Sequence, residues 1–311
     1  LLSETKSEGY IAELAKDYEG VRERYEAKQE RPLVPLETAR AKRLVFDEKR
    51  ANIHVPNQLG AFSFQNYSVE EISTRIDWGP FFLAWELRGK FPEVLDDPKQ
   101  GEEARALLDD AMAMLGTAAH SKRLQANGVY GIFPANSVGD DIEVYADESR
   151  KKVIATFRTL RQQKQKVGDK PYLALADYIA PKESGVADYI GAFAVTAGHG
   201  LSDWVSEYEV DNDDYGVIMA KVIADRLAEA FAERLHERVR REFWGYAEDE
   251  RFTNEELINV RYRGIRPAAG YPACPDHTTK LALFELIEAT KHTGVELTES
   301  MAMMPAANSL E

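Results

Sequence analysis

The sequence is nearly free of cysteine, since Cys274 is the single one among 311 residues. One cysteine excludes an intramolecular disulfide framework, and such usage is typical of proteins that work in the reducing cytoplasm. Cys274 lies between two prolines, and we interpret it as a small buried filler in preference to a reactive thiol. We therefore expect a cytoplasmic protein whose fold depends on a hydrophobic core.

Long hydrophobic runs are absent as well. No stretch reaches the about 18 consecutive apolar residues of a membrane-spanning helix, and the first residues do not resemble a signal peptide. Basic side chains are outnumbered, because 39 Lys and Arg face 53 Asp and Glu, a formal charge of -14. Such a surface repels nucleic acid phosphates and anionic lipids. We expect neither nucleic acid nor a membrane as a partner.

Motifs for metals and nucleotides are also missing. None of the six histidines has a partner at the spacing of a zinc site, and one cysteine cannot complete such a site. No Gly-x-Gly-x-x-Gly follows an expected strand, and no Gly-x-x-x-x-Gly-Lys-Ser/Thr occurs. We therefore expect neither a metal site nor a Rossmann-type fold in this chain.

Both ends of the chain have the character of flanking segments. The sequence starts without an initiator Met, and its final Leu310-Glu311 resembles an expression-vector scar, so we interpret residues 308–311 as such a remnant of a piece cut from a longer polypeptide. Residues 1–30 are expected to be a solvated helical linker, because apolar residues recur there at spacings of three and four. These residues are Tyr10, Leu14, Tyr18, Val21 and Tyr25.

The rest of the chain mixes the periodicities of helices and strands. Helices are expected over 69–72, 102–124, from the caps at 212–214 to about 243, and over 278–291 with a cap at Thr278 or Thr279. The buried stripe of the second is expected to include Met112, and that of the third to include Ile218, Leu227, Phe231 and Leu235. Strands are expected over 128–133, 142–145, 152–157, 172–176 and 190–195, with turns at 136–140 and 147–149. The short connections favour an antiparallel meander. We predict an α+β fold: one large domain, residues 31–307, with a twisted antiparallel sheet flanked by helices.

One stretch, residues 266–277, combines three prolines with a Gly-Tyr pair. Prolines exclude a long helix or a regular central strand, so a shaped loop is expected. Arg266 is a permanent cation whose planar fork suits a carboxylate, Gly270 permits close approach, and Tyr271 adds a rigid aromatic face. The loop is thus suited to a small, partly flat, anionic group.

Arg266-x-x-x-Gly270-Tyr271 resembles the signature of the S-adenosylmethionine-binding activation domain of cobalamin-dependent methionine synthase. Three further blocks resemble that domain in the same order, so the resemblance runs from about residue 27 to 305. These blocks are Asp77-Trp78-Gly79-Pro80-Phe81-Phe82, Pro134-Ala135-Asn136-Ser137-Val138-Gly139-Asp140-Asp141-Ile142 and Ala224-Asp225-Arg226-Leu227-Ala228-Glu229-Ala230.

The resemblance implies a ligand site for S-adenosylmethionine. It assigns the ligand's carboxylate to Arg266 and its ammonium to Asp77, and it places Glu229 near the ligand. The implied set of ligand-binding residues is completed by Ala268, Gly270 and Tyr271. For His277, two roles are expected as alternatives: it braces the loop, or it only starts a helix. Two plain alternatives stay open: an Arg266–Asp77 ion pair, and a solvated helix face for Glu229 and Asp225, which share one side of a helix.

The implied function is the reductive reactivation of methionine synthase, a 5-methyltetrahydrofolate–homocysteine S-methyltransferase. S-adenosylmethionine methylates cob(I)alamin formed from cob(II)alamin, with an electron from a flavodoxin-like reductase. Cobalamin would be held by the neighbouring domain of the same polypeptide, and zinc only by another module. Because cobalt is the nucleophile, no catalytic residue is named, and the fragment by itself is not expected to be a complete enzyme.

Two alternatives have different consequences. The family continues beyond the Pro305 region into a Tyr-rich tail, so this chain could be a docking module that has lost ligand binding. A stand-alone methyltransferase would act on a small substrate without a corrinoid. A basic run, Arg158, Arg161, Lys164 and Lys166, is a solvated loop or a docking patch for an acidic reductase.

Overall fold

The computed structural model describes residues 7–29, 32–49, 52–121, 123–305 and 307–310. They form two compact units. Unit 1 comprises residues 1–45 and 161–174, and unit 2 comprises residues 46–160 and 175–311.

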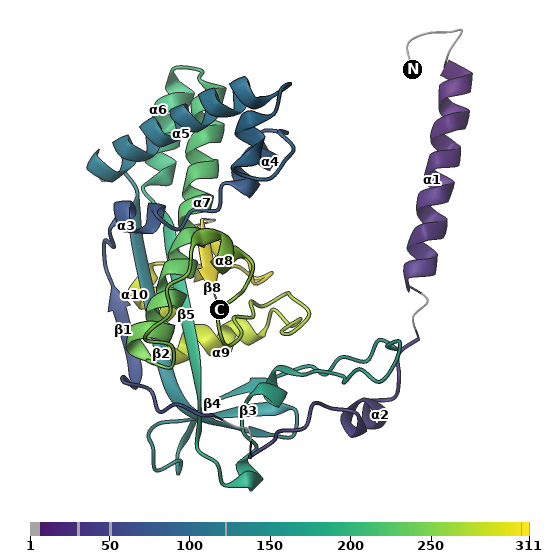
Figure 1. The fold of residues 1–311 in the computed structure, drawn as a ribbon, viewed down its shortest axis with the longest axis vertical. Coiled ribbons are helices and arrows are strands. Elements are labelled where there is room, and N and C mark those ends of the chain that lie inside the picture. Colours follow the sequence, from purple (N-terminus) through teal and green to yellow (C-terminus); the bar gives the residue numbers. More distant parts are fainter. Residues whose placement is uncertain (1–6, 30–31, 50–51, 122, 306, 311) are drawn as a thin grey trace. The chain divides into compact units, whose positions relative to one another are not determined.

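Unit 1 contains the expected N-terminal helix, α1 (Ser7–Gln29), drawn in purple in Figure 1. Its apolar stripe is open to solvent, because Tyr10, Tyr18 and Tyr25 are each more than half exposed. Pro35 precedes a second helix, α2 (Leu36–Ala41), which the sequence analysis missed. The boundary of a linker at residue 30 stays a prediction.

The basic run does not form an open patch of four cations. Within unit 1, Arg161 is buried and donates a hydrogen bond to the Tyr172 carbonyl. Lys166 donates to the Gln162 side chain and lies 5.4 Å from the centre of the Tyr172 ring. Both cations are bound by groups within unit 1. The hypothesis that the basic run docks a reductase therefore loses its motivating observation, an exposed cluster of four cations.

Unit 2 is built on a six-stranded antiparallel sheet whose central strand is β2 (Gln125–Val138) (Figure 1). The predicted meander is confirmed, since β2, β3 (Asp141–Tyr145) and β4 (Val153–Arg158) pair in succession. On its other side β2 pairs with the long strand β5 (Asp188–His199). The missed strand β1 (Gly60–Phe64) also pairs with β2.

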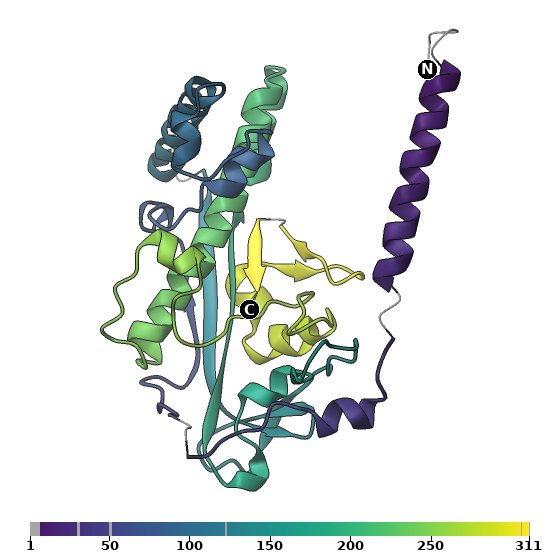
Figure 2. The ribbon, with the colours of Figure 1, turned by 45° about the vertical axis from the view of Figure 1, so that its right-hand side comes forward.

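Alternate residues of β2 point into two separate cores, as a period of two requires. Tyr130 and Ile132 join the core beneath the long helix, whereas Val129 and Phe133 join the core on the opposite face. Figure 2 shows the long strands between these layers, with the C-terminal segment in yellow on the second face. The central strand β2 is thus buried on both sides.

The first face is covered by helices. The long helix α7 (Asp214–Arg238) begins at Asp213, whose side chain accepts a hydrogen bond from the Gly216 amide, and it passes into a π-helical turn, η4 (Val239–Phe243). Further helices of unit 2 are α3 (Val69–Ser73), α4 (Gly79–Ala84), η1 (Glu93–Asp96), α5 (Gly101–Ser121), α6 (Leu201–Val210) and α8 (Asn254–Ile258).

Two helical stripes differ in detail from the prediction. On α5, Leu107 is buried and Met112 is half exposed, although Met112 was expected to face inward. On α7, Leu227, Phe231 and Leu235 are buried as expected, whereas Ile218 near its start is exposed. The helices themselves are confirmed, and only the edges of their buried faces were wrong.

The second face carries shorter elements. The helix expected over 278–291 is two helices, α9 (Thr279–Leu286) and α10 (Ala289–Thr293), because Glu288 adopts a left-handed backbone with φ 48°. Thr278 takes the expected N-cap position of α9, but its side chain makes no capping hydrogen bond; its own amide donates to the Asp276 carboxylate. The strand expected over 172–176 is wrong: its end winds into the 3₁₀-helix η2 (Leu175–Tyr178), and η3 (Lys182–Ser184) follows.

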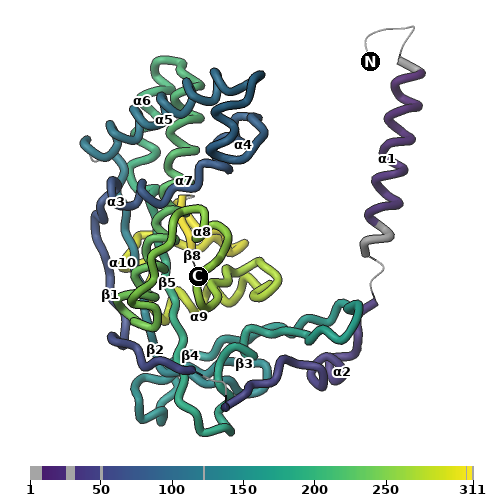
Figure 3. Tube along the Cα trace, viewed as in Figure 1, coloured from purple at the N-terminus to yellow at the C-terminus, as the bar shows by residue number. Residues whose placement is uncertain are grey.

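The end of the described chain adds an edge to the sheet. Asn308–Leu310 form β8, which pairs with Ala194–Thr196 of β5 and can be followed in yellow in Figure 3. A small hairpin, β6 (Glu296–Leu297) and β7 (Met303–Met304), precedes it. Three of the four residues interpreted as a vector remnant thus have a place in the sheet, and their origin stays a prediction.

Candidate functional site

The segment 263–277 is a loop, as its prolines predicted, and it passes beside the edge of β5. Its hydrogen bonds are local: the Gly270 amide donates to the Cys274 carbonyl at 2.8 Å, and the Cys274 amide donates to the Tyr271 carbonyl at 2.9 Å. Two cavities adjoin this loop, and both are lined by Gly191 and Pro267. The loop is therefore held in a defined conformation at the margin of both cores.

Gly270 has a backbone that only glycine adopts readily, with φ 99°. A Cβ at this position would lie 2.5 Å from Cε1 of His277, so the imidazole occupies the space that a side chain would need. His277 therefore packs against the loop, which agrees with the bracing role considered from the sequence. Tyr271 next to it is two-thirds exposed and presents its ring to solvent.

Arg266 is tied to the long helix. Its Nη1 lies 3.1 Å from Oε2 of Glu233 on α7, and the two side chains are only 17% and 15% exposed. Glu229 is four residues earlier on α7 and so lies on the same side of the helix, one turn away. Glu229 is exposed, and no described residue pairs with it. The helix thus places the predicted acid, Glu229, one turn from the acid that pairs with the predicted cation.

Asp77 lies at the start of α4, a helix that packs on α7. Its Oδ1 accepts a hydrogen bond from the Gly79 amide at 2.9 Å, which fixes the carboxylate at the head of the helix. The alternative Arg266–Asp77 ion pair is not formed, since Arg266 pairs with Glu233. Arg75, two residues before Asp77, binds Glu237 one turn beyond Glu233, so this segment is anchored to the same part of α7.

A buried cluster of polar and charged side chains, His236, Arg240 and Glu250, lies near Arg266. Arg240 is fully buried, donates to Nδ1 of His236 at 2.6 Å and forms an ion pair with Glu250 at 2.5 Å. Because an arginine can only donate, the His236 ring accepts at Nδ1 and carries its proton on Nε2. Burial, reinforced by Arg240 and Arg266, holds the pKa of His236 well below its usual value, so this histidine is neutral.

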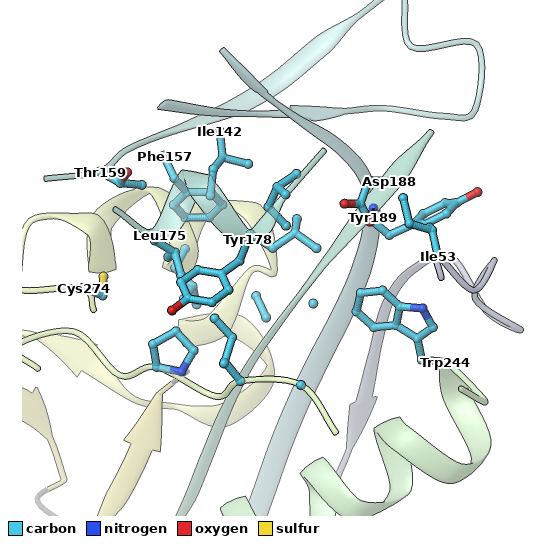
Figure 4. A pocket seen from close by; sticks show the side chains of 18 of the residues that line it. Ile53, Ile142, Phe157, Thr159, Leu175, Tyr178, Asp188, Tyr189, Trp244 and Cys274 are labelled. Carbon is cyan, nitrogen blue, oxygen red and sulfur yellow. Dashed lines mark hydrogen bonds between the residues drawn. The ribbon is translucent and has the colours of Figure 1, made fainter. Parts of the chain in front are cut away.

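The larger of the two cavities, of about 370 Å³, is shown in Figure 4 and is lined by residues of the second core together with Ile53, Tyr189 and Trp244 of the first. Its wall is mainly apolar, with Phe157, Leu175 and Trp244 among the labelled side chains. The site loop contributes Pro267, Ala269 and Cys274, whereas Arg266 belongs to the smaller cavity of about 100 Å³. Cys274 is half-buried there, with Sγ 3.6 Å from the Thr279 hydroxyl, in keeping with a filler.

The structure thus gathers most of the predicted residues without closing them into one cavity. Arg266, Ala268, Gly270 and Tyr271 share the loop, and Glu229 lies on α7 one turn from Glu233, the partner of Arg266. The sequence analysis missed Glu233, although its spacing of four from Glu229 was a readable signal, and it missed the buried His236. Within the described parts of the chain, no group of three or more His, Cys, Asp and Glu could hold a metal ion. No helix there is long and apolar enough to cross a membrane.

Two comparisons with known proteins concern the family and the fold of the chain. Residues 68–309 match the family model described as the vitamin B12-dependent methionine synthase activation domain. A solved structure, described as the MetH reactivation domain bound to AdoHcy, is 51% identical, covers 90% of this chain and 85% of its own, and superposes with a TM-score of 0.87. The α+β sheet with flanking helices is the fold of that domain. The chain therefore belongs to the activation-domain family of vitamin B12-dependent methionine synthase.

Proposed function

We propose that this chain binds S-adenosylmethionine and positions it for the reductive methylation that returns cob(II)alamin, by way of cob(I)alamin, to methylcobalamin. The observation that carries the proposal is the placement of Arg266 against α7, within one turn of Glu229 and at the head of a shaped loop. The solved relative that binds S-adenosylhomocysteine supports a ligand of this kind.

The residues fit the charges of the ligand's amino-acid end. A guanidinium can take a carboxylate through two parallel hydrogen bonds, and Arg266 offers that fork. Asp77 carries a carboxylate fixed by the Gly79 amide, which suits an ammonium group. Glu229 is exposed, so it can be reached without disturbing the core. Ala268, Gly270 and Tyr271 would supply backbone contacts and an aromatic face for the rest of the ligand.

The chain's contribution would be proximity and orientation, and not acid or base catalysis. A sulfonium is already a good leaving group, so a well-placed methyl group needs no proton transfer from the protein. Orientation of this kind is worth at most about 7–11 kcal/mol of the activation barrier. Cobalamin, held by a neighbouring domain of the same polypeptide, would supply the nucleophilic cobalt.

The wider setting is proposed on the same basis. The electron would come from a flavodoxin-like reductase, the location would be the cytoplasm, and zinc would be confined to another module. The engagement of Arg161 and Lys166 inside unit 1 argues against the basic run as the reductase's docking surface. Crosslinking of the chain to such a reductase would map the surface that binds it.

Calorimetric titration of the 311-residue chain with S-adenosylmethionine tests the proposal. We expect saturable binding with one site, and competition by S-adenosylhomocysteine. A folded chain that binds neither compound would contradict ligand binding and leave the alternative, a docking module for the cobalamin domain and a reductase. Methyl transfer to a small thiol without a corrinoid would instead indicate a stand-alone methyltransferase.

A further inference from the structure

The ion pair between Arg266 and Glu233 raises a question about ligand binding. Both side chains are largely buried, and separating such a pair would leave an uncompensated charge in a poorly solvated place. A ligand carboxylate is therefore a poor competitor for the position of Glu233. The guanidinium has five donors, however, and can hold two carboxylates at once. Glu233 can stay on Arg266 while a ligand binds.

The second oxygen of Glu233 is the unusual part of this arrangement. Oε1 is buried and accepts no hydrogen bond from any described residue. A buried acceptor without a donor is unfavourable, so such an atom calls for an explanation. His236, one turn further along α7, is neutral and holds its Nδ1 against Arg240, so it supplies no positive charge. The protein thus leaves this anion only partly satisfied.

We propose that Glu233 is a second acidic residue of the ligand site: Oε2 keeps Arg266 oriented, and Oε1 accepts a hydrogen bond from the ammonium of the ligand's amino-acid end. This inference rests on the proposed function. An amino acid presents a carboxylate and an ammonium side by side, which matches a guanidinium and a carboxylate side by side. An ammonium has three donors, so it can bind Glu233 and Asp77 together.

Two ion pairs attach the segments that carry Arg266 and Asp77 to the same helix, α7. Glu233 and Glu237 are one turn apart on α7, and Glu237 binds Arg75, two residues before Asp77. The chain leading to Asp77 and the loop carrying Arg266 are therefore fastened to adjacent turns of one helix. Glu233 is itself the attachment of the loop, and it lies one turn from Glu237, the attachment of the segment that leads to Asp77.

The test uses three ligands with the same adenosine. S-adenosylmethionine has the carboxylate and the ammonium, decarboxylated S-adenosylmethionine lacks only the carboxylate, and 5′-methylthioadenosine lacks both groups and the sulfonium charge. Their affinities are measured by calorimetry for the unchanged chain and for Glu233→Gln, Glu233→Asp and Arg266→Ala. Glu242→Gln is the matched control, because Glu242 pairs with Arg238 at 2.9 Å in the same region and lies outside the proposed site.

We expect Glu233→Gln to weaken S-adenosylmethionine and its decarboxylated form by about ten-fold or more, the usual effect of losing a hydrogen bond between charged groups. 5′-Methylthioadenosine should be unaffected, Glu233→Asp should be intermediate, and Glu242→Gln should match the unchanged chain. Arg266→Ala should weaken only the ligand that carries a carboxylate.

Three outcomes would overturn the inference. Equal affinities in Glu233→Gln and the unchanged chain would remove Glu233 from the site. A loss restricted to the ligand with a carboxylate would mean that Glu233 only orients Arg266. A loss shared by 5′-methylthioadenosine would indicate a general structural effect, which thermal melting would also detect. If the unchanged chain binds none of the ligands, the proposed function fails first, so the two failures are distinguishable.

Discussion

Arg266 is the residue on which the proposed site depends most. Replacing it with alanine removes both hydrogen bonds to the ligand carboxylate, so we expect binding of S-adenosylmethionine to weaken by roughly 1.5–3 kcal/mol. Arg266→Lys should restore only part of this loss, because an ammonium lacks the planar fork. Calorimetry on variants with unchanged circular dichroism decides the matter. An unchanged dissociation constant in folded Arg266→Ala would remove the assignment.

Substitution of Gly270 distinguishes the cost of its backbone conformation from the effect of its contact with His277. Gly270→Ala must adopt φ 99° and must also displace the His277 ring, so we expect a loss of affinity together with a stability loss of about 1–3 kcal/mol from backbone strain. Gly185→Ala is the matched control, since Gly185 also has positive φ, 69°, but faces open space. Melting curves and binding isotherms are measured on both.

The control decides how the glycine acts. If Gly270→Ala lowers stability as Gly185→Ala does but binds the ligand normally, Gly270 serves only the backbone. If Gly270→Ala with His277→Ala recovers affinity, the contact with His277 is what positions the loop.

The residues of the candidate site illustrate what a sequence can reveal. The motif around Arg266 predicted a loop and a cation because proline and glycine act locally on the backbone. The partner of Arg266 could not be predicted, because Glu233 is distant in sequence and meets it only when the loop passes the edge of β5. The alternative that Arg266 forms an ion pair was right, but its partner is Glu233 and not Asp77.

At the scale of elements, α7 is tied to α3 and the segment after it by a cluster of charges. Glu237 is 3% exposed and accepts from Arg75, Arg234 and Arg241 at 2.8–3.2 Å. Burial by itself would raise the pKa of Glu237, but the hydrogen bonds from Arg75 and Arg234 outweigh it and lower the pKa to about 2. This carboxylate therefore stabilises the folded state in its ionised form.

We expect Glu237→Gln to cost about 3 kcal/mol of unfolding free energy at pH 7, the amount that corresponds to a pKa falling from 4.5 to about 2. Because the folded pKa is depressed, the contribution is complete above about pH 4.5 and is lost as the pH falls towards 2. Urea unfolding of both chains should therefore converge at low pH. The exposed pair of Glu288 and Lys291 is the control, and Glu288→Gln should change stability far less than Glu237→Gln does, because solvent screens this pair. A gap that stays constant down to pH 2 would contradict the role of Glu237.

Elements were predictable where a local pattern matched the final packing. The meander of β2, β3 and β4 was predicted because short polar turns separate residues of period two. The strand expected over 172–176 failed since its neighbours offer only single hydrogen bonds, such as that from the Tyr172 amide to the Lys42 carbonyl. β1 was missed because its strand has a mostly exposed burial pattern and is defined by its pairing with β2.

At the scale of the whole molecule, the predicted fold class is confirmed, and so is the family. Both followed from four ordered blocks spread along the chain, which constrain a fold more than any single motif does. The structure adds that residues 161–174 join residues 1–45 in a unit of their own. That grouping joins segments more than a hundred residues apart, so no local pattern could have predicted it.

The net charge of the chain predicts how salt affects the affinity for S-adenosylmethionine. S-adenosylmethionine carries a sulfonium and has a net charge of about +1, whereas S-adenosylhomocysteine is neutral overall. A protein with a formal charge of -14 attracts the first through its summed field and the second hardly at all. We expect the affinity for S-adenosylmethionine to fall by a factor of about two to five as salt rises from about 0.05 to 0.5 M, because added salt shortens the Debye length.

S-adenosylhomocysteine serves as the internal control, since its binding should change much less over the same range. Sodium chloride and potassium acetate should have the same effect, because screening depends on ionic strength and not on the identity of the ion. Glu229 and Asp77 would contribute part of this attraction as local charges, so Glu229→Gln should flatten the salt dependence of S-adenosylmethionine binding more than that of S-adenosylhomocysteine binding. Parallel salt curves for the two ligands would show that the acidic surface has no part in selecting the cationic one.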